Sequence, residues 1–490
     1  MSRRTREKAV ASSTQTTGGQ RTRPVRGARS SRPGAGPSIP PLRPGQKVTL
    51  AFRGMTLEGA GVAMTGHQEI AVPFALPGEE AVVEITRSGR RVEGKIVSLL
   101  RKSSEATGPR CRHFGVCGGC QWQHLPYVAQ LQQKTQLVKT YLGPVLRGSS
   151  AVIHDAIGAD PWEYRSRIQA AFAMRRDKVV AGYYATGDDL RIINVQECPI
   201  QHDGNVSILH AARDAVAQLG WPMYDRDTGR GLVRGVIGQV GFASGEAMLV
   251  LCTAREVPDR MGLVRVVRDR IPNLTSLLLS VQPARTPELL GRIRLLWGRL
   301  YIEDELVGLR LRLYASAAVP PNPRALPLWL EAITRATGVT GTETVIDVAC
   351  EEGLVPLALA PHAARVVGVA PDREAMHRAW ENARLNGIDN CAFYTRAPAG
   401  VLAKLRARGE RVDVAVVTSR GKPLPPAAFS EAAQVGVHRV VCAGHSISLL
   451  AGDLRTAMSL GYQPVEIQPV DLLPQTSRIH CVATLVRSAS

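Results

Sequence analysis

The sequence predicts a multidomain protein with a small N-terminal β-barrel, an α+β central domain carrying a cysteine cluster, and a C-terminal α/β domain. Three observations support this fold class. The chain has 490 residues, which is too many for one ordinary hydrophobic core. Three of its nine cysteines lie in one short glycine-rich loop. Short apolar runs alternate with helical patterns in the last third of the chain, as in a doubly wound parallel sheet.

The first 40 residues predict a disordered basic tail. They hold nine Arg or Lys residues and one Glu, are rich in Ser, Thr, Gly and Pro, and contain few large apolar side chains. Such a tail can release counterions from RNA, but it can also serve only to keep a protein in solution. Its Arg and Ser content also suits a transit peptide, although no amphipathic period supports one. The start lacks the apolar segment of a secretory signal.

The net charge of +19 predicts a polyanionic partner. An acidic membrane surface would also suit this charge, but no basic amphipathic helix stands out, so RNA is favoured. No run approaches 18 consecutive apolar residues, and no membrane-spanning helix is therefore expected. We expect a cytoplasmic monomer that binds nucleic acid.

Residues 43–101 predict a small barrel of the oligonucleotide-binding kind. Short β-rich runs alternate with Gly and Pro turns at the spacing of such barrels; these runs are 47–52, 69–72, 81–86 and 91–99. Phe52 and Phe74 are the only aromatic residues of this segment, so it lacks a clear pair of stacking rings. RNA binding and a purely structural barrel are both compatible with this composition.

The rest of the chain divides into two predicted domains. Residues 103–320 mix strands and helices without a repeat and form the predicted central domain. Residues 324–487 predict a Rossmann-like α/β domain that closes with a pair of strands; its strand-like runs are 344–348, 365–369, 412–417 and 439–443, and the clearest helical pattern covers 373–386.

The stretch CRHFGVCGGCQWQH predicts a metal site. Cys111, Cys117 and Cys120 follow the spacing C-x5-C-x2-C, with glycines that let the loop wrap around a bound centre. Cys198 is the best candidate for a fourth ligand. Four thiolates suit structural zinc and a [4Fe–4S] cluster equally well. The other cysteines lie in apolar runs and are expected in the core: Cys252, Cys350, Cys391, Cys442 and Cys481.

Several stretches resemble the SAM-dependent RNA (uracil-C5) methyltransferases, which make 5-methyluridine in 23S rRNA and tRNA. The resemblance runs from about residue 43 to 487. It implies a TRAM barrel, a [4Fe–4S] cluster on Cys111, Cys117, Cys120 and Cys198, with zinc as the alternative, and a class I methyltransferase domain. It rests on the barrel and on CRHFGVCGGCQWQHLPYVAQLQQK, WEYRSRIQAAF, LLWGRLYIEDELVGLRLRLYASAAVPPNP, ENARLNGIDN and GYQPVEIQPVDLLPQT.

The resemblance also implies a reaction, and the sequence departs from it at the reacting groups. In that family a cysteine adds to C6 of a flipped-out uracil, C5 attacks the methyl group of SAM, and a glutamate removes the C5 proton. His445 occupies the nucleophile position and His480 the base position. Thr418 replaces the aspartate of D-P-P-R, and Pro320 replaces the glutamine of F-Q-V-N-P.

The cofactor loop departs as well. The family pattern D-L-Y-C-G-x-G-T falls on residues 347–354, where Asp347 and Gly353 are kept as weak candidates for binding SAM and Glu351 replaces the first glycine. A glutamate 4 Å from the SAM carboxylate would cost roughly 4 kcal/mol at an effective dielectric of 20. Ala370 stands where an acidic residue should hold the ribose, and Asp372 follows two positions later. S-adenosyl-L-methionine is therefore disfavoured.

Other retained residues indicate structure rather than chemistry. In ENARLNGIDN, Asn386 and Gly387 are expected to end a helix. Cys442 lies three residues before His445, on the opposite face of an extended strand, and is expected in the core. Arg165 and Arg167, with neighbouring Tyr164, would suit either RNA contact or a structural role.

The sequence thus favours a catalytically impaired member of the family, a pseudoenzyme that binds RNA and takes part in rRNA processing. One alternative is an active SAM-dependent 23S rRNA or tRNA uracil-C5 methyltransferase that has moved its reacting groups, with His445 or Cys442 essential. Another is an RNA-binding switch in which an Fe–S cluster responds to redox state or iron.

Overall fold

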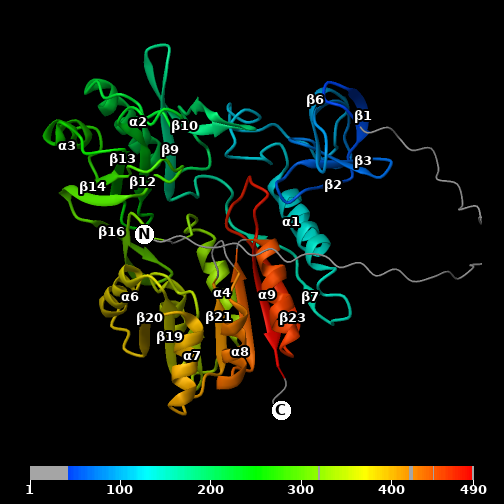
Figure 1. Cartoon of the computed structure of the whole chain (residues 1–490), viewed down its shortest axis with the longest axis vertical. Helices are drawn as coiled ribbons and strands as arrows, with labels where there is room; N and C mark the ends of the chain where they lie inside the picture. The colour runs from blue at the N-terminus through cyan, green and yellow to red at the C-terminus, as the bar shows by residue number, and fades with distance from the viewer. Residues whose placement is uncertain (1–41, 318–319, 419–422, 445, 488–490) are drawn as a thin grey trace, which may run out of the picture. The chain divides into compact units, whose positions relative to one another are not determined.

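The computed structural model describes residues 42–317, 320–418, 423–444 and 446–487 (Figure 1). The predicted tail, residues 1–40, and His445 at the predicted nucleophile position lie outside these residues. Within the described ranges the strands form sheets of six, seven and nine strands and one two-stranded hairpin.

The N-terminal segment folds into the six-stranded sheet, in the order β1-β5-β6-β4-β3-β2. Along β5 buried and half-buried side chains alternate, because one face packs on a core that includes Leu50, Phe52, Ile70 and Val83. The β-rich runs predicted for this segment are present as strands: β1 (Lys47–Ala51), β2 (Gly54–Met55), β3 (Gly61–Thr65), β4 (Gln68–Val72), β5 (Glu80–Arg87) and β6 (Val92–Arg101).

The central segment forms the seven-stranded sheet, in the order β11-β10-β9-β12-β13-β14-β15. Two helices, α2 (Asp203–Gln218) and α3 (Arg260–Arg268), pack their apolar stripes against it. A hairpin of β16 (Tyr301–Leu306) and β17 (Leu309–Tyr314) follows the sheet. The strands of the sheet are β9 (Arg167–Arg175), β10 (Lys178–Ala185), β11 (Asp188–Asn194), β12 (Val233–Val240), β13 (Ala247–Thr253), β14 (Leu274–Val281) and β15 (Arg292–Gly298).

One part of the predicted central domain belongs with the C-terminal sheet instead. The short strands β7 (Val152–Ile153) and β8 (Ile157–Gly158) pair in parallel with β23 (Gln463–Asp471). Helix α1 (Tyr127–Leu142) packs beside α9 (Ile447–Ser459). The chain therefore crosses to the C-terminal sheet just after the cysteine loop and returns before β9.

The C-terminal segment has the predicted Rossmann-like architecture (Figure 1). Its sheet follows the order β20-β19-β18-β21-β22-β24-β23-β7, parallel from β20 to β22 and antiparallel at β24. The remaining strands are β18 (Thr344–Asp347), β19 (Arg365–Ala370), β20 (Cys391–Thr395), β21 (Val414–Val417), β22 (Arg439–Gly444) and β24 (His480–Val486). The helices are α4 (Leu326–Thr337), α5 (Leu354–Leu359), α6 (Arg373–Leu385), α7 (Pro398–Ala407) and α8 (Pro426–Val435), with a 3₁₀ turn at Ala360–His362.

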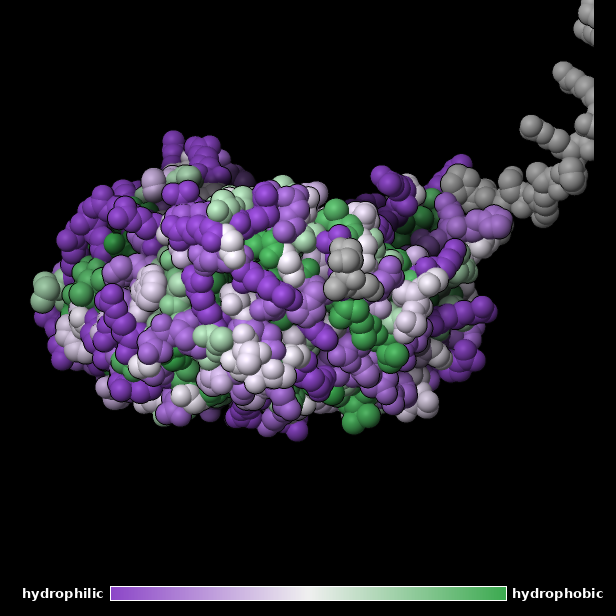
Figure 2. Space-filling model, turned by 90° about the horizontal axis from the view of Figure 1, so that it is seen from below, coloured by the Kyte–Doolittle hydropathy of each residue, from purple (hydrophilic) through white to green (hydrophobic). Residues whose placement is uncertain are grey.

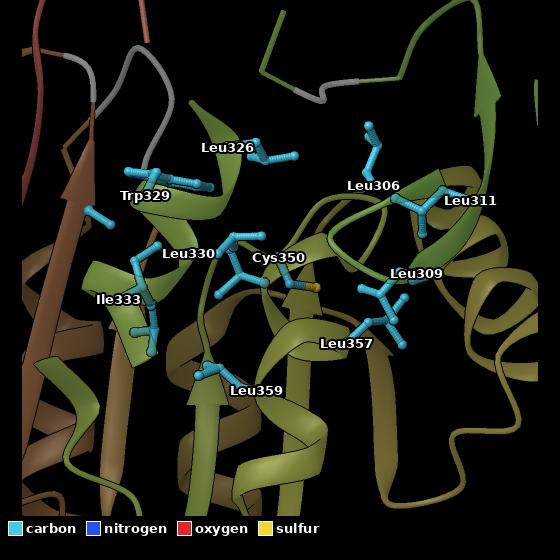
Figure 3. Packing of buried hydrophobic residues seen from close by; sticks show 14 of the residues in the cluster. Leu306, Leu309, Leu311, Leu326, Trp329, Leu330, Ile333, Cys350, Leu357 and Leu359 are labelled. Atoms are coloured by element: carbon cyan, nitrogen blue, oxygen red, sulfur yellow. The ribbon is translucent and has the colours of Figure 1, made fainter. Parts of the chain in front are cut away.

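Helices cover both faces of this sheet because its strands are apolar on both sides. Val345 packs in one core with α4, α5 and α6, and the next residue, Ile346, packs in a second core with α1, α7, α8 and α9. The first core also takes in Leu309 and Leu311 of the β16–β17 hairpin, which Figure 3 shows near Leu357 of α5. The hairpin thereby fixes the end of the central segment against the C-terminal sheet.

The molecular face in Figure 2 is mostly hydrophilic, with hydrophobic residues in small separate groups. Among the described residues, each helix is too short or too polar to cross a membrane.

Candidate functional site

The four predicted ligand cysteines line one cavity of about 600 Å³. Cys111, Cys117 and Cys120 come from the loop before α1, and Cys198 comes from the loop before α2. The first loop is held in place by the neighbouring hairpin, because Gly118 N–H donates to the carbonyl of Tyr184 at 3.0 Å. The folded chain therefore places Cys198 on the same cavity as the three clustered cysteines.

Burial disfavours the thiolate form of three cysteines of this cavity. Burial raises the pKa of Cys120 to about 12 and that of Cys198 to about 11. Burial also raises the pKa of Cys117. No three His, Cys, Asp or Glu side chains in the described part of the chain are arranged to hold a metal ion. The thiols thus border a shared space but would have to lose protons and draw together around a bound centre.

Arginines share this cavity with the cysteines. Arg165, Arg167 and Arg478 all line it. Arg167 donates hydrogen bonds to Gln239 Oε1 at 3.0 Å and to the carbonyl of Ala315 at 2.5 Å, and burial lowers its pKa to about 10. Tyr164, by contrast, is fully buried and donates to the carbonyl of Pro474 at 2.9 Å, which is a structural role.

A second candidate site lies where β18 and β21 end, at the carboxyl edge of the C-terminal sheet. Asp347 is fully buried, and its Oδ1 accepts hydrogen bonds from Ala349 N–H at 3.1 Å and from Thr418 Oγ1 at 3.0 Å. Oδ2 is buried and has no hydrogen-bond partner among the described residues. Burial raises the pKa of Asp347 to about 7. Thr418 therefore bonds across the strand ends to a carboxyl group that is only partly ionised at neutral pH.

The turn after Asp347 has two residues with left-handed backbone, although the first glycine of the family pattern is replaced by Glu351. Glu351 has φ 45°, the left-handed conformation that costs a residue with a side chain roughly 1–2 kcal/mol. Gly353 has φ 87°, and a Cβ there would lie 2.9 Å from Cβ of Ala379. Gly353 is thus required by backbone and packing, whereas Glu351 holds its conformation against a steric penalty.

The second glutamate of the turn is neutralised by a cation. Glu352 Oε1 lies 3.6 Å from Arg378 of α6, and both side chains are largely buried. The same guanidinium donates to Ser316 Oγ at 2.6 Å and to Glu374 at 2.9 Å, and it lies 4.4 Å from the ring centroid of Tyr314. Arg378 therefore links the turn to the end of β17.

The next strand end offers no free acidic group at the expected position. Ala370 is buried at the end of β19. Asp372 is exposed and caps α6, because its carboxylate accepts a hydrogen bond from Glu374 N–H at 2.9 Å. The suggestion that Asp372 could hold a ribose now competes with this capping role.

Comparisons with known proteins identify the family. A protein named "uncharacterized RNA methyltransferase" from Halalkalibacterium halodurans is 32% identical over 449 residues, covering 91% of this chain and 98% of the relative. A relative of the same name from Bacillus cereus is 30% identical over 452 residues, covering 91% and 98%. The chain belongs to the RNA methyltransferase family. No family model matches the sequence.

A solved structure shows the same fold as this RNA methyltransferase family member. The tRNA (uracil-54, C5)-methyltransferase of Pyrococcus abyssi, solved with S-adenosyl-L-homocysteine, superposes with a TM-score of 0.72 at 22% identity. The match covers 89% of this chain and 99% of that chain. The multidomain α/β methyltransferase fold is thereby confirmed.

Within this RNA methyltransferase fold, the suggested substitute nucleophile lies in the core. Cys442, on β22, is 2% exposed, and burial raises the pKa of its thiol well above the ordinary value. His480, at the start of β24, packs edge-on against Trp329 with ring centroids 6.4 Å apart. Cys481 beside it is buried.

The asparagines of ENARLNGIDN do more than the sequence suggests. Asn386 is the C-cap of α6 and Gly387 has φ 64°, which confirms the predicted helix end. In addition, Asn382 and Asn386 accept hydrogen bonds at 2.9 Å from the backbone N–H groups of Arg312 and Arg310 in β17. These side chains hold the β16–β17 hairpin on α6.

Sequence analysis missed the segment 471–477, where distant parts of the RNA methyltransferase chain converge. Asp471 forms an ion pair with Lys134 of α1 at 2.7 Å, with both side chains fully buried. The carbonyl of Gln475 accepts from Gln121 and Trp122 N–H, at 3.0 and 3.1 Å, directly after the cysteine loop. These partners are more than 300 positions apart, so no local pattern signals them.

Proposed function

We propose that the chain is an RNA-binding member of the RNA (uracil-C5) methyltransferase family that does not methylate uracil through a cysteine adduct. The observation that carries this proposal is the location of the cysteines. All nine are described; five are buried in the core, and the other four border the cysteine cavity. The five core thiols are buried and have raised pKa values, so they supply neither the access nor the thiolate that addition to C6 needs. The four cavity cysteines are instead proposed to hold a metal centre.

RNA is the proposed ligand, in particular ribosomal RNA. The net charge of +19 and the three arginines of the cysteine cavity favour a polyanion. The relatives at about 30% identity carry the name RNA methyltransferase. Residues 43–101 would act as a TRAM-type barrel beside the central domain, residues 103–320, and the methyltransferase domain, residues 324–487.

Cys111, Cys117, Cys120 and Cys198 would hold a [4Fe–4S] cluster, with zinc as the alternative. The donor set fits because four thiols from two loops line one cavity. When bound, such a cluster supplies a covalent cross-link between the two loops and a centre able to carry an electron. Iron and acid-labile sulfide should be found in protein purified without oxygen. Iron should be lost in Cys198→Ser, whereas zinc in place of iron would remove the cluster assignment.

A second function, an active SAM-dependent 23S rRNA or tRNA methyltransferase, is favoured by the turn at residues 347–353. The turn keeps left-handed backbone at Glu351 and Gly353, and Arg378 neutralises Glu352. Arg378 therefore offsets one of the two negative charges that the turn carries. The turn can still accommodate the methyl donor, but with reduced affinity.

One experiment separates the two functions. Full-length protein is incubated with SAM carrying a tritiated methyl group and with either ordinary rRNA fragments or fragments containing 5-fluorouridine. The first proposal expects RNA binding, no tritium on the ordinary RNA and no adduct that survives denaturing electrophoresis. A stable adduct would mean that a nucleophile is present, since the fluorine at C5 cannot leave as a proton does. Calorimetric titration with SAM measures donor binding independently.

A further inference from the structure

One surface groove adjoins the cysteine cavity, and a second groove adjoins the first. The first, of about 590 Å³, lies between the N-terminal sheet and the β10–β11 hairpin and is lined in part by Phe74, Arg91 and Gly119. The second, of about 390 Å³, lies over β9, β10 and β11. Tyr183 lines both the cysteine cavity and the first groove, and Tyr184 lines both grooves. The first groove thus meets the cysteine cavity at Tyr183 and meets the second groove at Tyr184.

Tyr184 provides the exposed ring that the N-terminal sheet lacks. Phe52 is 2% exposed in the core of that sheet. Phe74 packs edge-on against Phe114 of the cysteine loop, with ring centroids 5.2 Å apart. Tyr184 is 37% exposed, while its backbone carbonyl is fixed by Gly118 N–H. An aromatic side chain on an anchored strand and open to solvent is a suitable platform for a nucleobase.

Cations border both grooves. Arg91 in the first groove pairs with Glu58 at 3.2 Å, but both side chains are more than half exposed, so exchange of this partner for a phosphate costs little. Arg226 lines the second groove. Strands β9 to β11 and the β9–β10 turn add exposed cations without an ion pair in the described residues: Arg175, Arg176, Lys178 and Arg191.

Two carboxylates near the second groove accept hydrogen bonds within their own turns. Asp225 accepts hydrogen bonds from the N–H and hydroxyl of Thr228, and these bonds lower its pKa. Asp188, in the β10–β11 turn, accepts from the N–H groups of Leu190 and Arg191. Asp189 and Asp227 also line the groove. Because acidic and basic side chains both line the groove, a compact anion is disfavoured as its ligand. A single strand of RNA is favoured, since its bases can stack while its phosphates contact separate arginines.

We propose that the grooves form a track for single-stranded RNA, in which one base stacks on Tyr184 and a neighbouring phosphate contacts Arg91. The track leads past Tyr183 to the cysteine cavity and its arginines. The proposal rests on the proposed function only in taking RNA as the ligand. It adds the conformation of the RNA, its path and the stacking residue.

The test is fluorescence anisotropy with the full-length chain and a fluorescein-labelled, 12-nucleotide single-stranded RNA. Tyr184→Ala should weaken binding roughly 5- to 150-fold, because loss of one base–aromatic stack costs about 1–3 kcal/mol. Tyr184→Phe should stay within about twofold of wild type, since the ring is kept. The matched control is Trp380→Ala: this aromatic side chain is 38% exposed on α6 and lines neither groove.

Salt dependence separates the two contacts. Arg91→Gln should lower the slope of log affinity against log salt by about 0.7, the value of one phosphate on a single strand, while Tyr184→Ala leaves the slope unchanged. An RNA duplex of the same sequence should compete poorly, because its bases are already stacked. Thermal unfolding of each variant verifies that it is folded.

The outcomes distinguish this proposal from the proposed function. If wild type binds the RNA and Tyr184→Ala binds equally well, the stacking site is wrong and the RNA-binding function stands. Equal losses in Tyr184→Ala and Trp380→Ala would also overturn the stacking site. If wild type does not bind the single strand but does bind the duplex, the track is wrong while RNA binding remains. If wild type binds neither, both proposals are wrong.

Discussion

Asp347→Asn should stabilise the protein in alkaline solution. Asp347 is fully buried, two donors bond its Oδ1, and its pKa is raised to about 7. In an unfolded chain the group would titrate near about 3.9. The folded state therefore holds this proton more tightly, and its stability falls as pH rises from about 4 to about 7. Above that window the penalty approaches about 4 kcal/mol, an upper limit that relaxation around the carboxylate reduces.

An asparagine at 347 can accept the same two hydrogen bonds without a charge. Urea unfolding, followed by tryptophan fluorescence at pH 5 and pH 8, should show the variant gaining on wild type as pH rises. Asp372→Asn is the matched control: Asp372 is exposed, and asparagine caps a helix as well as aspartate does, so little change is expected at either pH. A variant of Asp347 that is no more stable than wild type at pH 8 would refute the assignment of a buried, costly charge.

Three further predictions concern the buried ion pair, the turn after β18 and the cysteine cavity. Lys134→Met should cost about 3–5 kcal/mol in urea unfolding, because it leaves Asp471 buried without its cation. The double variant Lys134→Met, Asp471→Asn should recover much of this loss, and a small effect of the single change would contradict the pairing. Glu351→Gly should add about 1 kcal/mol of stability by relieving the left-handed strain and should tighten SAM binding in calorimetry; unchanged affinity would mean that the carboxylate points away from the donor. Cys198→Ser should abolish the visible absorbance of protein purified without oxygen, and retained absorbance would exclude Cys198 as a ligand.

The sequence predicts those parts of the fold that local patterns encode. The apolar runs of the C-terminal segment became β18, β19, β21 and β22, and Asn386 with Gly387 ended α6 as expected. The crossing of residues 127–158 to the C-terminal sheet could not be predicted, because β7 and β8 are two residues long and gain their partners only from β23. A strand of two residues is too short to show the alternation of apolar and polar residues by which strands are predicted.

The sequence indicates the candidate site most directly in the loop that carries three of its cysteines. The grouping of Cys111, Cys117 and Cys120 is local, and Cys198 was placed with them by its residue type and context. The pairing of Glu352 with Arg378 was missed, since it depends on how α6 lies against the turn. Local sequence shows that two glutamates occupy the turn, but only the packing shows that Arg378 pairs with Glu352.

The retained and altered positions differ in what they contact. Gly353 cannot accept a Cβ because Ala379 lies 2.9 Å away, and Asn382 bonds the backbone of β17, so a change at either would disturb packing. Thr418 and Ala370, by contrast, lie at strand ends on the carboxyl edge of the sheet. Ligands bind at this edge in such sheets, so the residue type there depends on the ligand more than on core packing. Thr418 now bonds Asp347 across that edge, whereas an aspartate in its place would oppose a second buried carboxylate. Gly353 and Asn382 therefore hold the turn and the β16–β17 hairpin in place, whereas Thr418 joins the ends of two neighbouring strands.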